Sequence, residues 1–233
     1  MNIEDFKNGK VLVIDKPLNW TSFQVVNKIR WAIRKKFKIK KIKVGHAGTL
    51  DPLATGILIV CTGKETKKII EYQAEGKEYT GTITLGGTTP SFDLETEIDQ
   101  SYPTEHITEQ TLLETAASFV GKIEQKPPLY SALKKDGVRL YHLARKGEQV
   151  EINAREVEIF AFEITDIAMP VISFRIECSK GTYIRSIAND FGEKLNSGGH
   201  LSSLRRTKNG SFTIESASTL KSFLEQLGNE TMT

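Results

Sequence analysis

Apolar residues recur along the chain with two different periods, and the period separates predicted strands from predicted helices. A strand is expected where apolar and polar residues alternate, or where a short apolar run lies between turn residues. The predicted strands are residues 10–15, 57–61, 77–85, 155–165 and 171–178. A helix is expected where apolar residues recur every three or four positions. The predicted helices are residues 22–36, 64–72, 108–121, 140–147, 182–195 and a short one beyond about 214.

The order of these elements predicts the fold class. Strands and helices are interspersed without a regular βαβ rhythm, which favours an α+β fold. We expect a mixed, largely antiparallel sheet flanked by helices. The glycine-rich residues 44–56 and the polar residues 88–104 are expected to be loops. With 233 residues and neither an internal repeat nor a linker, the chain is expected to form a single domain, 1–233.

Charge is unevenly distributed along the chain. The net charge of +3, from 32 basic and 29 acidic residues, does not by itself indicate a nucleic-acid partner. Residues 34–43, RKKFKIKKIK, however contain seven basic residues and no acidic one. Such a run is either a solvated charged surface or a phosphate-binding one. Arg205, Arg206 and Lys208 form a second, smaller basic patch.

The two cysteines and the lack of targeting signals bear on location. Cys61 and Cys178 lie in apolar runs far apart in sequence, without metal-ligand spacing, so buried reduced thiols are expected. No N-terminal signal pattern occurs, and no apolar run approaches about 18 residues. A cytoplasmic protein with no membrane association is therefore expected.

The most informative segment is residues 45–56, GHAGTLDPLATG. Asp51 stands between apolar Leu50 and Pro52, and flanking glycines allow the backbone to come close to a ligand. An Asp-Pro pair most often forms a simple turn in which the carboxylate bonds its own backbone. The nearby His46 and the buried strand that follows favour a functional carboxylate instead. The residues alone leave both interpretations open.

Several segments together resemble the TruB family, the tRNA pseudouridine-55 synthases. GHAGTLDPLATGILIV resembles the family signature, and five further segments resemble family motifs in the family's order. These are DKPLNWTSFQVV, KEYTGTITLG, KPPLYSALKKDGVRLYHLAR, CSKGTYIRSIANDFGEKL and GGHLSSLRRT. The resemblance covers most of residues 10–215. It implies an enzyme that isomerises a uridine in the T-loop of tRNA to pseudouridine, in a pseudouridine synthase fold.

The resemblance also implies roles for single residues. Asp51 would be the nucleophile that lets the C–N glycosidic bond break, the uracil rotate and the ring rejoin through carbon. Arg185 would pair with Asp51, and Tyr79 would pack on a base flipped out of its stack. Further implied contacts are Tyr183 and Leu204 in the uracil pocket, and His46 and Asp93 at the RNA loop. No metal site and no cofactor is implied, and no Cys/His cluster suggests one.

For most of these residues the sequence also allows a purely structural interpretation. Arg185 lies off the apolar stripe of its helix and could face solvent. Tyr79, Tyr183 and Leu204 could be ordinary core residues, and His46 a solvated loop residue. Lys35, Lys36, Lys40, Lys41 and Lys43 of the basic run, with Arg205 and Arg206, are expected to contact the RNA backbone.

The expected partner is tRNA, bound by a monomer without an obligate protein partner. Many family members carry a C-terminal PUA-type module, which we expect to be absent or vestigial because the chain stops soon after the last motif. One alternative is a tRNA-folding chaperone without catalysis, and another is a guide-RNA-dependent relative acting on ribosomal RNA. A metal-dependent nuclease is disfavoured, because it would need converging carboxylates or histidines.

Overall fold

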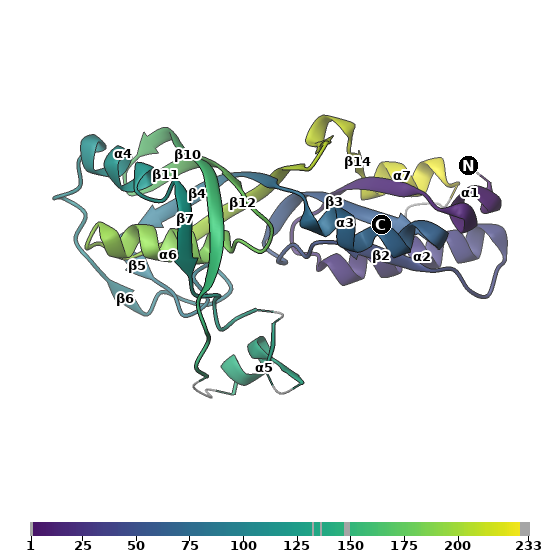
Figure 1. Ribbon diagram of the computed structural model, residues 1–233, viewed down its shortest axis with the longest axis horizontal. Helices are drawn as coiled ribbons and strands as arrows, with labels where there is room; N and C mark the ends of the chain where they lie inside the picture. Colours follow the sequence, from purple (N-terminus) through teal and green to yellow (C-terminus); the bar gives the residue numbers. More distant parts are fainter. Residues whose placement is uncertain (1, 132, 136, 147–149, 229–233) are drawn as a thin grey trace. The chain divides into compact units, whose positions relative to one another are not determined.

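A computed structural model describes residues 2–131, 133–135, 137–146 and 150–228 (Figure 1). They fall into two compact units, which we call unit 1 and unit 2. Unit 1 takes the described residues of Met1–Tyr79 and Arg205–Thr233, and unit 2 those of Thr80–Leu204. In the part of the chain that is described, no helix has the length and apolar character needed to cross a membrane.

Unit 1 combines helices with a small sheet. Its helices are α1 (Ile3–Asn8), α2 (Ser22–Phe37), α3 (Ile69–Ala74) and α7 (Leu220–Gln226), with 3-10 turns η1 (Gly63–Lys68) and η2 (Ile214–Ser216). Its strands are β1 (Val11–Lys16), β2 (Val44–Ala47), β3 (Ala54–Thr62), β13 (Phe212–Thr213), β14 (Ser218–Thr219) and parts of β4 (Lys77–Leu85) and β12 (Gly199–Asn209). The strands pair in the order β14-β1-β3-β12, and β2 pairs with β3. β1 and β14 run parallel, whereas the β1–β3 and β2–β3 pairs are antiparallel.

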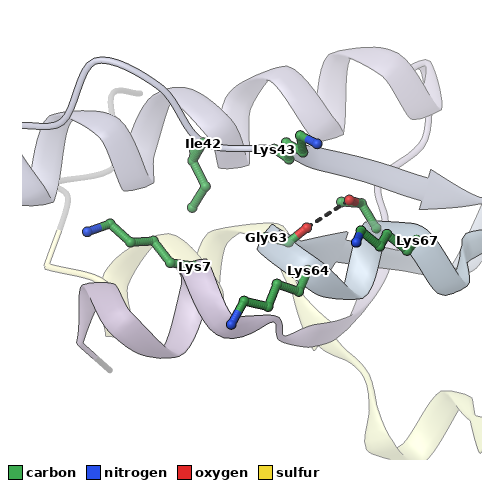
Figure 2. Close-up of a pocket in the computed structure, with 7 residues that line it drawn as sticks. Lys7, Ile42, Lys43, Gly63, Lys64 and Lys67 are labelled. Atoms are coloured by element: carbon green, nitrogen blue, oxygen red, sulfur yellow. Dashed lines mark hydrogen bonds between the residues drawn. The ribbon is translucent and has the colours of Figure 1, made fainter.

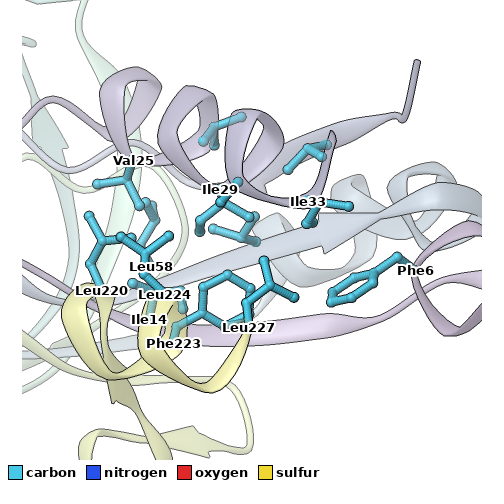
Figure 3. Packing of buried hydrophobic residues seen from close by; sticks show 14 residues of the cluster. Phe6, Ile14, Val25, Ile29, Ile33, Leu58, Leu220, Phe223, Leu224 and Leu227 are labelled. Atoms are coloured by element: carbon cyan, nitrogen blue, oxygen red, sulfur yellow. The ribbon is translucent and has the colours of Figure 1, made fainter. Parts of the chain in front are cut away.

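The core of unit 1 explains why β3 reads as an unbroken apolar run. Leu58 and Val60 belong to the cluster formed with α1, α2 and α7 (Figure 3). Ile57, Ile59 and Cys61 point to the opposite face, where α3 and η2 contribute side chains. Because successive strand residues point to opposite faces, a strand covered on both sides carries no polar alternation. The expected burial of Cys61 is confirmed.

Unit 2 is built on the other parts of β4 and β12. Its own strands are β5 (Gly87–Thr88), β6 (Gln100–Ser101), β7 (Gly121–Gln125), β8 (Lys134–Lys135), β9 (Val138–Arg139), β10 (Arg155–Ala168) and β11 (Val171–Cys178). Its helices are α4 (Glu109–Ala117), α5 (Leu140–Ala144) and α6 (Ile184–Lys194). The main strands pair in the order β12-β4-β11-β10-β7, and β10 is antiparallel to both neighbours. Phe119, Phe162 and Phe191 form its aromatic centre.

The predicted α+β class with a mixed, largely antiparallel sheet is confirmed. The helix expected over 22–36 spans 22–37, and its capping box of Thr21 and Gln24 is present. The expectation that 44–56 is all loop is wrong, because β2 and the start of β3 form there. Val44 and Ala47 are buried against β3, so tertiary pairing overrides the glycine-rich composition. The predicted helix end at Gly147 lies outside the described residues.

Candidate functional site

Asp51 lies in a short loop of unit 1, residues 48–53, that joins β2 to β3 and that we call the acid loop. Ser22, the first residue of α2, bonds the residue that precedes Asp51. The Ser22 hydroxyl accepts a hydrogen bond from the Leu50 amide at 2.9 Å and donates one to the Leu50 carbonyl at 3.1 Å. On the far side, the Ala54 amide donates to the Asp51 carbonyl at 3.1 Å. The backbone on both sides of Asp51 is therefore fixed, while the residue itself is half-buried.

A buried lysine forms a second support of the acid loop. Lys16, at the end of β1, is fully buried and donates from Nζ to three backbone carbonyls. These belong to Trp20 at 2.6 Å, Pro17 at 3.0 Å and Pro52 at 3.3 Å. The Asn19 amide donates to the same Pro52 carbonyl at 2.9 Å. The residue next to Asp51 is thus tied to the end of β1.

A buried arginine from β12 forms the third support. Arg206 is 1% exposed and donates from Nε to the Ile57 carbonyl at 2.8 Å and from Nη2 to the Gly48 carbonyl at 3.1 Å. The backbone of β12 also runs close to β3 here. A Cβ at Gly56, where φ is +97°, would lie 2.2 Å from the Arg206 carbonyl oxygen, so only glycine fits.

The supports give the acid loop a positive surrounding. The pKa of Lys16 is lowered from 10.5 to about 8, mainly by burial; the Asp51 carboxylate opposes this shift, and Arg206 adds to it. The pKa of His46, in β2, is lowered from its ordinary 6.5 mainly by burial and next by Arg206, and the Gly48 backbone partly offsets this. His46 is therefore a neutral imidazole at neutral pH. Lys16 and the Asp51 carboxylate are thus close enough to attract each other.

Unit 2 holds the predicted Arg185 in the first turn of α6. Its guanidinium is 3% exposed, so the alternative that it faces solvent is wrong. Nη1 donates to the Ser91 carbonyl at 3.2 Å, and Nη2 donates to the Tyr130 carbonyl at 2.9 Å. Nε lies 3.5 Å from Oδ2 of Asp93. The guanidinium is thus fixed in direction by two segments of unit 2, the turn that contains Ser91 and Asp93 and the segment around Tyr130.

Asp93, which the sequence assigned to the RNA loop, is 5% exposed and ion-pairs with Arg185. Its other carboxylate oxygen accepts the Glu95 amide at 3.0 Å. The hydroxyls of Thr89 and Ser91 donate to its carbonyl at 2.7 and 3.0 Å. This tight turn makes Asp93 a residue that positions Arg185, and its burial does not suit a surface contact with RNA.

The aromatic and apolar candidates are partly or wholly buried. Tyr183 is half-buried just before α6, where its amide and carbonyl bond the Gln125 side chain at 2.8 and 3.0 Å. The Arg155 guanidinium lies 4.8 Å from the centroid of the Tyr183 ring. Tyr79 in β4 is 8% exposed, and Leu204 in β12 is half-buried. These positions agree with both the structural and the functional interpretation.

The basic residues divide into exposed and buried ones. The lysines predicted to contact RNA are all exposed; they are Lys35, Lys36, Lys40, Lys41 and Lys43. Arg205 is partly exposed and forms a two-pronged ion pair with Asp15, at 2.7 and 3.1 Å. Arg206 is buried and bonded to backbone carbonyls, so the expectation that it belongs to a surface phosphate patch is not supported.

Lys43 also borders a shallow cavity of about 280 Å³ in unit 1 (Figure 2). The cavity is lined by Lys7, Ile42, Lys43, Gly63, Lys64, Thr66 and Lys67. Four of the lining residues are lysines, but Lys7 is paired with Glu4 at 2.9 Å and Lys64 donates to the Asn8 side chain at 3.1 Å. Among the described residues, no three His, Cys, Asp or Glu side chains gather in a way that could hold a metal ion.

The predicted site residues are shared between the units. Unit 1 contains His46, Asp51, Tyr79 and Arg205, and unit 2 contains Asp93, Tyr183, Arg185 and Leu204. The pairing of Asp51 with Arg185 stays a prediction. Sequence reasoning missed the roles of Lys16, Ser22 and Gln125, which support predicted residues from a distance in sequence. A lysine at the end of an apolar strand was the only available signal for Lys16.

Two family models match adjoining parts of the chain. The model described as TruB family pseudouridylate synthase (N terminal domain) matches residues 34–184. The model described as tRNA pseudouridylate synthase B C-terminal domain matches residues 185–232. The chain belongs to the TruB family. It is accordingly a tRNA pseudouridine synthase, an isomerase, and the resemblance drawn from its motifs is confirmed.

Relatives and solved structures agree with this membership. A tRNA pseudouridine synthase B of Flavobacterium johnsoniae is 59% identical over 97% of this chain and 100% of its own length. One from Phocaeicola vulgatus is 57% identical over 97% of this chain and 96% of its own. A chain from a Cbf5-Nop10-Gar1 complex is 30% identical with a TM-score of 0.71. That match covers 94% of this TruB-family chain but only 54% of the solved one, so the present chain spans about half of its length.

Proposed function

We propose that this TruB-family enzyme isomerises the uridine at position 55, in the T-loop of tRNA, with Asp51 as the nucleophile. The N1–C1′ bond of the target breaks, and a bond from C5 to C1′ forms. N1 gains a proton and C5 loses one, so the product has the composition of the substrate. The uridine is flipped out of its stack, because a stacked nucleotide cannot present its glycosidic bond to a protein carboxylate.

The observation that carries the proposal is the bracing of the acid loop. A nucleophile gains most when it is ionised and held near the reacting atom before the substrate arrives. Ser22, Lys16 and Arg206 fix the backbone around Asp51 by hydrogen bonds. An Asp-Pro turn with no chemical role would not require two buried cations, which are costly to desolvate.

In the proposal, Arg185 pairs with Asp51 when the substrate is bound and keeps its carboxylate ionised and oriented. The burial of the guanidinium and its contacts with Asp93, Ser91 and Tyr130 support this role, because they set its direction in advance. Tyr79 packs on the flipped base, and Tyr183 and Leu204 line the uracil pocket. Half-buried or buried apolar surface suits a base that has left water.

RNA is held mainly through its backbone in this proposal. The exposed lysines at 35, 36, 40, 41 and 43 and the cavity bordered by Lys43 offer positive charge on unit 1. His46 contacts the RNA loop as a neutral ring, and Arg205 reaches the backbone only by loosening its pair with Asp15. The protein acts as a monomer on tRNA without an obligate protein partner.

The test uses purified protein, an unmodified tRNA transcript and EDTA. Pseudouridine is mapped by carbodiimide modification and reverse-transcription stops. The wild type should modify one T-loop uridine, while Asp51→Asn should bind the transcript with similar affinity and give no product. Asp99→Asn, which removes an exposed carboxylate elsewhere, is the matched control and should retain full turnover.

Two results would overturn the proposal. Turnover by Asp51→Asn above background would remove Asp51 as nucleophile. Tight tRNA binding by the wild type with no pseudouridine in any loop would instead favour a binding protein that assists tRNA folding.

A further inference from the structure

The outer face of α2 combines positive charge with exposed aromatic rings. The face, which we call the α2 outer face, consists of Phe23, Lys28, Trp31, Arg34 and Lys35. Phe23 is 64% exposed and Trp31 is 44% exposed. These residues lie opposite the buried side of the helix, which packs into the core of unit 1 through Val25, Ile29 and Ile33, among others (Figure 3).

Trp31 holds two lysines in place. The Nζ of Lys28 lies 5.4 Å from the centroid of the Trp31 ring, and the Nζ of Lys35 lies 4.9 Å from it. Residues three and four positions away on a helix are neighbours on its surface, so one ring serves both ammonium groups. In the described part of the chain, no carboxylate forms an ion pair with Lys28 or Lys35. The two charges are thus fixed in place and not neutralised.

The sequence on either side of this face carries positive charges only. No Asp or Glu occurs between Asp15 and Asp51, and residues 22–43 contain nine Lys and Arg. A surface of this kind attracts a polyanion and repels cationic partners. A basic helix could also bind an anionic membrane, but that mode needs a free apolar stripe. Here the apolar stripe is occupied by the protein core, and only two exposed rings remain.

We infer that the α2 outer face is a docking surface for the RNA backbone, in which Trp31 positions Lys28 and Lys35 to contact phosphates. The inference rests on the proposed function for its substrate class. Ser22, at the start of α2, bonds the acid loop, and the 16 residues of the helix extend about 24 Å from it. The face therefore contacts nucleotides away from the target uridine, and it affects affinity without taking part in the reaction.

The test measures dissociation constants for unmodified tRNA at several NaCl concentrations in EDTA. Lys28→Gln/Lys35→Gln should weaken binding about tenfold at low salt and make the salt dependence shallower, by about 0.7–0.9 in log–log slope for each phosphate no longer neutralised. Trp31→Ala should weaken binding several-fold, and Trp31→Phe, which keeps a ring under the lysines, should restore most of it. In saturation kinetics, the KM for tRNA should rise in line with each loss of affinity.

Lys122→Gln/Lys221→Gln removes two exposed lysines of other elements and is the matched control. Thermal unfolding of each variant separates loss of binding from loss of fold. The inference is overturned if Lys28→Gln/Lys35→Gln has the same affinity and salt slope as this control. It is also overturned if the variant keeps tRNA binding but loses binding to vesicles of phosphatidylcholine and phosphatidylglycerol. A wild type that binds RNA through this face but makes no pseudouridine would count against the proposed function alone.

Discussion

The acid loop and the basic segment that precedes it, residues 34–43, follow each other closely in sequence but are built in opposite ways. The acid loop has its backbone bonded by Ser22, Lys16 and Arg206, all of which are buried. The basic segment exposes nearly every charged side chain. One region has its backbone held in a single arrangement by buried donors, and the other presents its charges at the surface, with Lys35 packed against the exposed Trp31 ring.

The difference follows from what each region has to do. A carboxylate that attacks one carbon must be correct to within a fraction of an ångström, so its supports are buried and directional. Attraction between lysines and phosphates acts over several ångströms and tolerates many geometries. The structure therefore predicts that single changes damage the acid loop, whereas the basic segment loses function gradually.

The substitution expected to disrupt the acid loop most is Arg206→Gln. The change leaves the Ile57 and Gly48 carbonyls without their buried donor, while it relieves the repulsion between Arg206 and Lys16. We expect a net loss of about 2–4 kcal/mol in the free energy of unfolding, with a lower turnover number in the surviving protein. Urea denaturation and single-turnover assays measure the two effects.

The neighbouring Arg205→Gln is the matched control. It removes a partly exposed ion pair with Asp15 and should cost less than about 1 kcal/mol. Equal losses of unfolding free energy in the two variants would mean that buried Arg206 stabilises the protein no more than the partly exposed Arg205 does.

A somewhat smaller effect is expected for Lys16→Met. Three partly buried carbonyls lose a donor, but the cost of desolvating the ammonium disappears as well, so we expect a net loss of about 1–3 kcal/mol. Because the folded pKa is about 8 and the unfolded one 10.5, the unfolded state binds more protons between these values. The Lys16 contribution to the free energy of unfolding therefore rises with pH across that window.

Lys16→Met should remove this rise, as measured by urea denaturation on both sides of pH 8. Lys10→Met, at a partly exposed lysine just before β1, should leave the pH dependence as in the wild type. If the rise with pH persists in Lys16→Met, a group other than Lys16 causes it.

The elements predicted most accurately from the sequence are those in which apolar residues recur at a regular spacing. The strand expected over 77–85 has those bounds, and α2 was predicted to within one residue because its cap and its apolar stripe agree. β12 was missed, because its inward-facing residues include Arg206 and Asn209, which are polar yet buried. Inward polar residues hide the alternation by which a strand is recognised.

The candidate site shows the same division. The loop around Asp51 could be recognised as a candidate because glycines, a proline and a carboxylate stand together in sequence, and the resemblance to the TruB family then favoured a catalytic role. Its supports could not, because Lys16 lies 36 residues from Pro52, and Arg206 lies 149 residues from Ile57. The ion pair of Asp93 could not be predicted either, because its partner Arg185 comes from a different element.

The basic segment should respond to charge removal in steps. Replacing Lys36, Lys40 and Lys41 with Ser should lower tRNA affinity about tenfold at low salt, equivalent to about 1.4 kcal/mol. The log–log salt dependence should become shallower by about 0.7–0.9 for each phosphate that the variant fails to neutralise. The turnover number should not change, because these exposed side chains do not support the acid loop. Filter binding and saturation kinetics measure both quantities.

Single replacements in the same set test whether the decline is gradual. Each should give a fraction of the triple effect, whereas at Arg206 a single replacement is expected to lower both stability and turnover. A triple variant with unchanged affinity at low and high salt would show that the basic segment is only a solvated surface.

The smallest expected effect concerns His46 and pH. Burial, followed by Arg206, lowers the pKa of its imidazole below 6.5, so the folded protein resists protonation that the unfolded chain accepts. The free energy of unfolding should therefore fall as the pH drops below 6.5, by at most about 1.4 kcal/mol per pH unit from this group.

His46→Gln replaces the ring with a neutral polar side chain that cannot take up a proton, so the slope between neutral pH and the folded pKa should become flatter. His142→Gln changes an exposed histidine of α5 and should leave the slope unaltered. Urea denaturation at several pH values measures the difference. If both variants behave alike, acid sensitivity comes from outside the acid loop. If only His46→Gln flattens the slope, the strand that leads into the acid loop responds to pH through one half-buried ring, unlike the basic segment, whose charges lie at the surface.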